Sequence, residues 1–148
     1  MGRTRRPKLG QHFLTSENYR QRIVASLPLG ADDLVLEIGP GRGAMTELLA
    51  ARARRVIAVE LDVALAKQLA ENLRDNAKIE IVRGDILTAD LSALCRRNGF
   101  ERCVVFGNLP YYITSPILHH LFDQADSIHS MSLLVQREVA ERLTARPG

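Results

Sequence analysis

The tetrapeptide Asn108-Leu109-Pro110-Tyr111 follows an apolar run that predicts a buried strand. The side-chain carbonyl of Asn108 and the backbone carbonyl of Leu109 can accept hydrogen bonds from the two N–H groups of an exocyclic amine. Pro110 fixes the backbone, and Tyr111 offers a ring on which a planar base can stack. Because such bonds free the lone pair of the amine, the motif predicts a site that makes a base amine nucleophilic, mainly by positioning it. A proline turn with packed tyrosines is the alternative for the tetrapeptide alone.

A glycine-rich loop follows an earlier apolar run, in the sequence EIGPGRGAMT over residues 37–46. Gly39, Gly41 and Gly43 let the backbone turn tightly and approach a ligand closely. The same loop, with Ala44 in the third position, also satisfies the dinucleotide-binding pattern. A purely structural glycine turn is a further alternative. The loop alone therefore predicts a nucleotide-like cofactor without choosing its class.

Acidic residues follow the glycine loop at the ends of the next two predicted strands. Glu60, followed by Leu61, could accept hydrogen bonds from both hydroxyls of a ribose. Asp85 could accept from the amine of an adenine, with the backbone of Ile86 available to the ring, although a turn cap is the alternative for an aspartate. Glu37 would repel a pyrophosphate but suits a cofactor with a sulfonium and an amino group. We therefore predict S-adenosyl-L-methionine as the cofactor.

Strands that alternate with helices must position these loops. Ser16, Asp62 and Ser115 are the predicted helix caps, the last followed by Pro116 in the first turn. We predict strands over 34–38, 55–61, 78–85, 102–108 and 130–136, and helices over 17–28, 43–53, 63–74, 91–97, 116–124 and 137–145.

This alternation predicts an α/β fold with a doubly wound, mostly parallel sheet of strand order 3-2-1-4-5. Ligands of such sheets bind beyond the carboxyl ends of the strands, where the strand order reverses. That point lies between the first and fourth strands. The glycine loop and the motif at Asn108 follow those two strands, so both loops fall where the topology predicts a site.

The composition is that of an ordinary globular domain, with 148 residues, 46% apolar and 25% charged. No apolar run is long enough to cross a bilayer, and no apolar segment follows the basic N-terminus, so we expect neither a membrane span nor a secretory signal. Cys95 and Cys103 suggest neither a disulfide framework nor a zinc site, and Cys103 is read as a small buried hydrophobe. We expect a cytoplasmic protein without a metal.

The net charge is +3, and its distribution is uneven. Arg3, Arg5, Arg6 and Lys8 form a basic arm that could bind RNA phosphates through counterion release. A solvated tail is the alternative.

The order of these motifs resembles that of class I S-adenosylmethionine-dependent methyltransferases acting on the amines of nucleic-acid bases. KLGQHFL over 8–14, NLPYYITSPI and LVQREVAERL narrow the resemblance to the ribosomal RNA adenine dimethyltransferases of the kasugamycin-resistance type, over residues 8–148. The resemblance implies a Rossmann-like fold. It also implies that Gln11, His12 and Leu14 close over the cofactor, and that Asn108 lies between the cofactor and the target amine.

The same resemblance places Gly39 and Gly41 under the methionine part of the cofactor, Glu60 at its ribose and Asp85 at its adenine. The implied reaction puts two methyl groups on each of two adjacent adenosines of small-subunit (16S) ribosomal RNA, as a step in ribosome maturation. Tyr112 departs from the family pattern, in which asparagine is common at that position. His119, His120 and His129 are assigned no role beyond helix or loop.

The family normally continues with further strands and a small helical domain. We therefore expect a basic arm and cofactor-closing segment over 1–15 and a catalytic domain over 16–148, with the last strands and the C-terminal helical domain absent. The expected form is a monomer acting on ribosomal RNA in the small subunit. Alternatives are a large-subunit methyltransferase of the antibiotic-resistance type and a non-catalytic RNA-binding assembly factor. A nicotinamide oxidoreductase is opposed by Glu37 and by the motif at Asn108.

Overall fold

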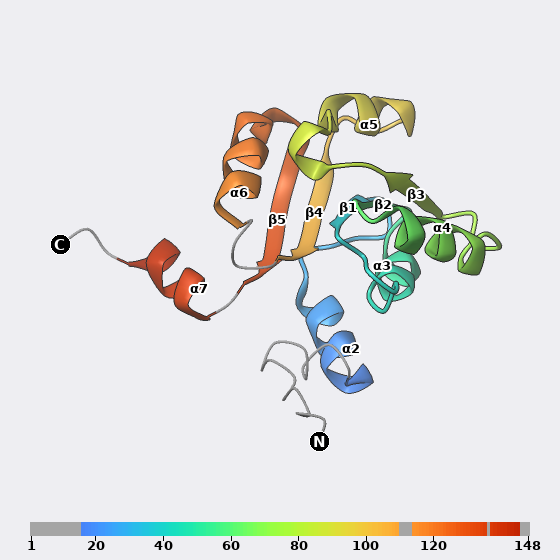
Figure 1. The fold of residues 1–148 in the computed structure, drawn as a ribbon, viewed down its shortest axis with the longest axis horizontal. Coiled ribbons are helices and arrows are strands. Elements are labelled where there is room, and N and C mark those ends of the chain that lie inside the picture. Colours follow the sequence, from blue (N-terminus) through green and yellow to red (C-terminus); the bar gives the residue numbers. More distant parts are fainter. Residues whose placement is uncertain (1–15, 110–113, 136, 146–148) are drawn as a thin grey trace, which may run out of the picture.

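In the computed structural model, residues 16–109, 114–135 and 137–145 are described. Within these ranges, parallel strands form one sheet of order β3-β2-β1-β4-β5 (Figure 1). The strands are β1 (Leu34–Ile38), β2 (Arg55–Glu60), β3 (Ile79–Arg83), β4 (Cys103–Asn108) and β5 (Ile128–Leu134). The predicted fold class and strand order are confirmed. β1 and β4 are direct neighbours, so the strand order reverses at the predicted place.

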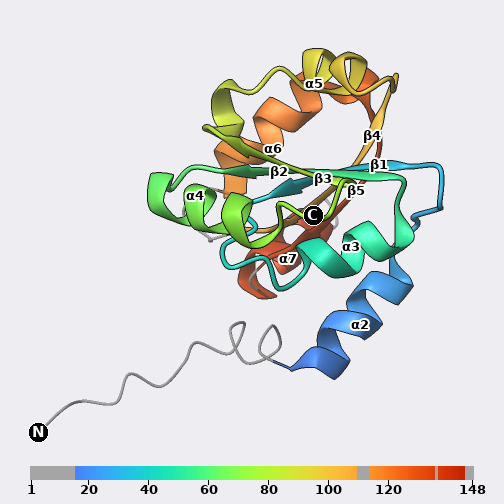
Figure 2. The ribbon, with the colours of Figure 1, turned by 90° about the vertical axis from the view of Figure 1, so that its right-hand side faces the viewer.

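Helices cover both faces of the sheet, as Figure 2 shows edge-on. On one face lie α5 and α6, and on the other lie α2 and α3, while α4 packs against β3 and β2. The bounds are α2 (Glu17–Ser26), α3 (Thr46–Arg52), α4 (Val63–Asn72), α5 (Leu91–Arg97), α6 (Thr114–Asp123) and α7 (Arg137–Thr144), with 3₁₀ turns η1 (Ile86–Thr88) and η2 (Ala125–Ser127). The helix α7 follows β5 and projects away from the sheet in Figure 1.

The two faces of the sheet bury separate apolar clusters, because successive side chains of a strand point to opposite sides. Leu36 and Val105 pack with Leu121 of α6 on one face. Val35 and Phe106 pack with Leu49 of α3 on the other. All five residues of β1 are buried, which is typical of a strand covered on both faces. The central strand is therefore a rigid base for the loops at its carboxyl end.

The helix α2 ends at Ser26, two residues earlier than predicted. Leu27 precedes Pro28, and a residue before proline is disfavoured in helical conformation; Leu27 has a ψ of 142°. The Arg52 guanidinium then satisfies the carbonyls that the helix end exposes. It donates to Val24 O, to Leu27 O at 3.5 Å and to Leu29 O at 2.6 Å. This contact fixes α2 against α3.

Other boundaries also differ from the prediction by a few residues. Ser16 and Asp62 are confirmed as caps of α2 and α4. The prediction of Ser115 as a cap is wrong, because α6 already begins at Thr114 and Ser115 lies inside its first turn with Pro116. The strand β5 spans Ile128–Leu134 rather than 130–136.

Candidate active site

The predicted acidic residues and glycines gather at the carboxyl edge of the sheet. Glu37 lies in β1, Glu60 ends β2, and Asp85 follows β3 by two residues. Asn108 is the last residue of β4 and is exposed. Since these strands are neighbours in a parallel sheet, their carboxyl ends meet at one edge, as the sequence predicted.

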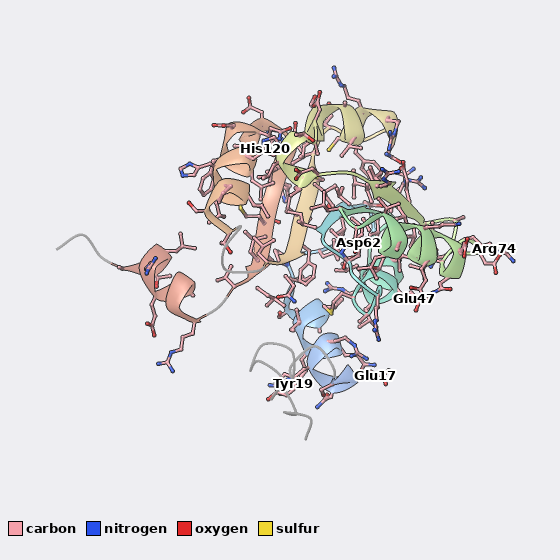
Figure 3. All side chains as sticks on the ribbon, in the orientation of Figure 1. Glu17, Tyr19, Glu47, Asp62, Arg74 and His120 are labelled. Carbon is pink, nitrogen blue, oxygen red and sulfur yellow. The ribbon has the colours of Figure 1, made fainter. Side chains whose placement is uncertain are left out.

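The carboxylate of Glu60 joins two loops of this edge. Its Oε2 accepts from the backbone N–H of Gly41 at 3.1 Å, and its Oε1 accepts from the N–H of Asp62 at 3.1 Å. The residue is only 7% exposed. Figure 3 shows Asp62 at the start of α4. Each oxygen keeps a second lone pair, so the carboxylate can still accept from ribose hydroxyls while it holds the glycine loop.

Glu37 is a buried acid directly beneath the glycine loop. It is 2% exposed and accepts a hydrogen bond from the hydroxyl of Thr46, which is also buried. Burial raises the pKa of Glu37 to about 7; the Thr46 hydrogen bond opposes this rise and the charge of Glu60 adds to it. Near neutral pH this carboxyl therefore changes charge, and a cation bound at the edge would favour its ionised form.

The three glycines of the loop have different roles. All have positive φ angles, of 64°, 59° and 84° at Gly39, Gly41 and Gly43. A Cβ added at Gly39 or Gly41 would meet nothing within 4 Å, so the backbone there faces open space that a ligand can approach. These two positions thus fit the predicted cofactor. A Cβ at Gly43 would lie 2.4 Å from Leu69 Cδ1, so this glycine serves packing against α4.

The sequence predicted that this helix begins at residue 43, whereas α3 begins at Thr46. The positive φ of Gly43 explains why the helix does not include that residue. A right-handed helix cannot pass through this conformation.

We expect Gly43→Ala to destabilise the protein by about 2–3 kcal/mol, since it combines an unfavourable φ with a clash against the buried Leu69. Gly99→Ala is the matched control, because Gly99 has a φ of 81° with no atom within 4 Å of its added Cβ. The control should lose only about 1–2 kcal/mol of stability, which is the cost of placing a Cβ at a positive φ. Urea unfolding measures both; equal losses would contradict the packing role of Gly43.

Asp85 caps the turn η1, which was the alternative reading of this residue. Its Oδ1 accepts from the N–H of Leu87 at 2.9 Å, and its carbonyl accepts from the N–H of Thr88 at 3.1 Å. The cap uses one carboxylate oxygen, so the other can accept from an amine. Ile86 begins the 3₁₀ turn, whose own hydrogen bonds do not use its N–H. Capping and ligand binding are thus compatible here.

Apolar side chains border the same edge unequally. Leu61, next to Glu60, is 62% exposed, whereas the side chain of Ile86 is buried in the core. A cavity of about 280 Å³ lies beside Asp85, lined also by Thr88, Ala89 and Arg97. A larger hollow of about 370 Å³, lined by Glu47, Asn72, Leu73, Asp75, Asn76 and Ala77, includes none of the predicted site residues.

Part of the predicted site lies outside the described residues. These positions are Arg3, Arg5, Arg6, Lys8, Gln11, His12, Leu14, Pro110, Tyr111 and Tyr112. Of the motif at Asn108, the structure places Leu109, which is buried and donates its N–H to Leu134 O at 3.0 Å. That hydrogen bond continues the pairing of β4 with β5.

The described residues contain neither a membrane-spanning helix nor a group of side chains that could bind a metal. In the three described ranges, no helix is long and apolar enough to cross a membrane. Within the same part of the chain, no three His, Cys, Asp or Glu side chains are arranged to hold a metal ion. Both cysteines are free and buried, as predicted for Cys103.

Sequence reasoning missed the partners that hold the site in place. Thr46 was not singled out, although its place at the end of the glycine loop brings its hydroxyl to Glu37. Gln124 and His120 were also missed. Both contact the segment that follows η1, across a gap of more than thirty residues in the chain. No local pattern in the sequence signals these contacts.

This strand order, with a glycine loop at the carboxyl edge of the sheet, is the fold of the class I S-adenosylmethionine-dependent methyltransferases. The family model described as ribosomal RNA adenine dimethylase matches residues 2–148. The chain therefore belongs to the ribosomal RNA adenine dimethylase family.

Curated relatives and a solved structure agree with this assignment. The chain is 46% identical over 143 residues to ribosomal RNA small subunit methyltransferase A of Geobacter metallireducens. The matched region covers 97% of this chain and 52% of the relative. The protein of the same name from Acidobacterium capsulatum is 49% identical, with coverages of 97% and 50%. The crystal structure of the 23S rRNA methyltransferase ErmE matches with a TM-score of 0.73 and 37% identity, over 87% of this chain and 50% of that one. The chain thus spans about half the length of the relatives it matches.

Proposed function

We propose that the protein transfers methyl groups from S-adenosyl-L-methionine to the exocyclic amines of two adjacent adenosines in small-subunit ribosomal RNA. The observation that supports this proposal is that β1 and β4, which precede two different functional motifs, end side by side at the strand-order reversal. An open glycine loop bordered by carboxylates follows β1, and the motif at Asn108 follows its neighbour β4. One loop suits a cationic nucleoside donor and the other an aromatic amine.

The donor would be held mainly by oxygen acceptors. In this proposal, Glu60 accepts from the ribose hydroxyls, Asp85 accepts from the adenine amine, and the N–H of Ile86 donates to the ring. Leu61 covers the adenine with its exposed side chain. Gly39 and Gly41 let the methionine part lie against the backbone. Gln11, His12 and Leu14 are proposed, from the family resemblance alone, to close over it.

The acceptor amine would be activated by Asn108 and Leu109. Their carbonyls accept from its two N–H groups, which favours a pyramidal nitrogen whose lone pair faces the donor. The bound donor supplies an activated methyl group, so no strong general base is needed. Tyr111 stacks on the base, which must leave any helix to enter the site. Arg3, Arg5, Arg6 and Lys8 are proposed to bind the RNA backbone.

The experiment is a methyl transfer assay with labelled donor on immature small ribosomal subunits, followed by mapping of the modified base. We expect label on two adjacent adenosines. Isothermal calorimetry should show binding of S-adenosyl-L-methionine and weak or no binding of NAD. Preference for NAD would overturn the choice of cofactor, and binding without transfer to any RNA would favour an assembly factor.

A second candidate is a large-subunit target. It is favoured by the 37% identity to ErmE, a 23S rRNA methyltransferase. The higher identities of 46% and 49% to small-subunit methyltransferases favour the first proposal. Offering both subunits in the same labelled assay separates the two candidates by where the label appears.

A further inference from the structure

We propose that Gln124 and His120, at the end of α6, are positioning residues that hold the Asp85–Ile86 turn in place and thereby set the selectivity of the site for an adenine amine. This inference rests on the proposed function, because it concerns how the same site recognises its donor. It assigns a role to two side chains that lie outside the strand ends and loops of the site itself.

The side-chain amide of Gln124 forms two hydrogen bonds with the backbone of the segment that follows η1. Its Oε1 accepts from the backbone N–H of Leu91 at 2.7 Å, and its Nε2 donates to the carbonyl of Ala89 at 3.1 Å. A donor and an acceptor on one planar group thus match one acceptor and one donor of the main chain. The Leu91 contact fixes which amide atom is the oxygen, because only an oxygen can accept from that N–H.

His120 supports the same contact one helical turn earlier. Its Nε2 lies 2.9 Å from Ala89 O and 2.6 Å from Gln124 Nε2. Depending on the tautomer, this ring nitrogen either donates to the Ala89 carbonyl or accepts from the Gln124 amide, and in both cases His120 contacts the same group of atoms. Figure 3 shows His120 on α6, on the side that faces η1. Gln124 directly follows the end of α6, four residues after His120, so the two side chains approach the Ala89 carbonyl from the same end of the helix. Both are half-buried, so water screens these bonds only in part.

The segment that Gln124 contacts directly follows the turn proposed to bind adenine. The N–H of Ala89 donates to Ile86 O at 3.2 Å, and the N–H of Thr88 donates to Asp85 O at 3.1 Å. A 3₁₀ turn of three residues has few bonds of its own, so its position depends on its ends. The end after the turn is fixed by Gln124 and His120. A shift there would move the free carboxylate oxygen of Asp85 away from the amine.

The contact also links the two halves of the proposed reaction centre. The helix α6 begins at Thr114, shortly after the motif at Asn108, and His120 in its last turn contacts the segment behind Asp85, together with Gln124 just after the helix. The helix therefore follows the motif proposed for the acceptor base in the chain, and its other end contacts the segment behind the turn proposed for the donor adenine.

The test compares the affinities of the full chain for S-adenosyl-L-homocysteine and for its inosine analogue, in which an oxygen replaces the adenine amine. The wild-type protein should prefer the adenine form by about tenfold or more, the size of one hydrogen bond to a charged group. In Gln124→Met the preference should fall to about twofold or less, with weaker binding of the adenine form. Gln124→Glu keeps the acceptor for Leu91 but not the donor for Ala89, and should lie between.

Gln68→Met is the matched control, because Gln68 is exposed on α4 and should keep the full preference. Should Gln124→Met fail to fold, His120→Phe serves in its place, with the exposed neighbour His119→Phe as its control. A folded variant that keeps the wild-type preference overturns the inference. If wild-type protein binds neither compound, the proposed function fails instead, so the two failures are distinguishable.

Discussion

Asn108→Ala should lower the rate of methyl transfer by about 10²–10³-fold, the usual cost of removing one polar group that stabilises a transition state. The side chain is exposed at the end of β4, so its loss should leave the fold intact. The proposed role is to accept from the amine as it becomes pyramidal, which is stronger in the transition state than in the ground state. The turnover number should therefore fall much more than the affinity for the donor.

The assay for Asn108 is labelled transfer to immature small ribosomal subunits, with donor affinity measured separately by calorimetry. Asn72→Ala is a suitable control, since Asn72 is an exposed asparagine on α4 away from the proposed acceptor loop. It should keep wild-type rates. Near-normal transfer by Asn108→Ala would remove this residue from the reaction, while an equal loss in both variants would point to a general effect of the substitutions.

Glu37→Gln should remove a large pH dependence of stability. The pKa of this carboxyl rises from 4.5 to about 7 on folding, chiefly through burial. Between these pH values the folded chain holds a proton that the unfolded chain releases, so stability falls as pH rises through this window. The fall amounts to about 3 kcal/mol. Glutamine resembles the protonated acid in shape and can still accept from Thr46, so it should avoid the cost of a buried charge.

Urea unfolding at about pH 5 and about pH 8 measures this effect. Wild-type and Glu37→Gln proteins should be similarly stable at the lower pH, and the variant should be more stable by about 2–3 kcal/mol at the higher pH. Glu71→Gln changes the net charge equally at an exposed position, and its free energy of unfolding should depend on pH as in the wild-type protein. If the stability of Glu37→Gln still falls between these two pH values as in the wild type, another group is responsible for the pH dependence. In the proposed function the ionised Glu37 would attract the cationic donor, so the stabilised variant should bind that donor more weakly.

The main features of the fold could be predicted because each depends on local signals. Continuous apolar runs such as Cys103–Phe106 give buried parallel strands, and Asp62 caps its helix through its own side chain. The predicted helix ends were wrong where the backbone conformation of one residue determines them. The positive φ of Gly43 excludes it from α3, and the extended conformation of Leu27 before Pro28 ends α2.

The placement of the predicted site residues could be inferred from the topology, because Glu60, Asp85 and Asn108 each lie at or just after the end of a parallel strand and so share one edge of the sheet. What the sequence could not give are the bonds between distant segments. The Glu60 contact to Gly41 spans 19 residues, and the Gln124 contact to Leu91 spans 33. Such contacts depend on how helices pack over the sheet, which no single window of sequence encodes.

The loops joined by Glu60 are fixed before any ligand arrives, and this has a consequence for turnover. A preformed surface loses little conformational freedom on binding, so affinity comes from the groups it recognises. Here those groups would be the ribose and the adenine, which remain unchanged after the methyl has left. Spent donor should therefore compete strongly with fresh donor, and its release would limit the rate at which successive methyl groups are added.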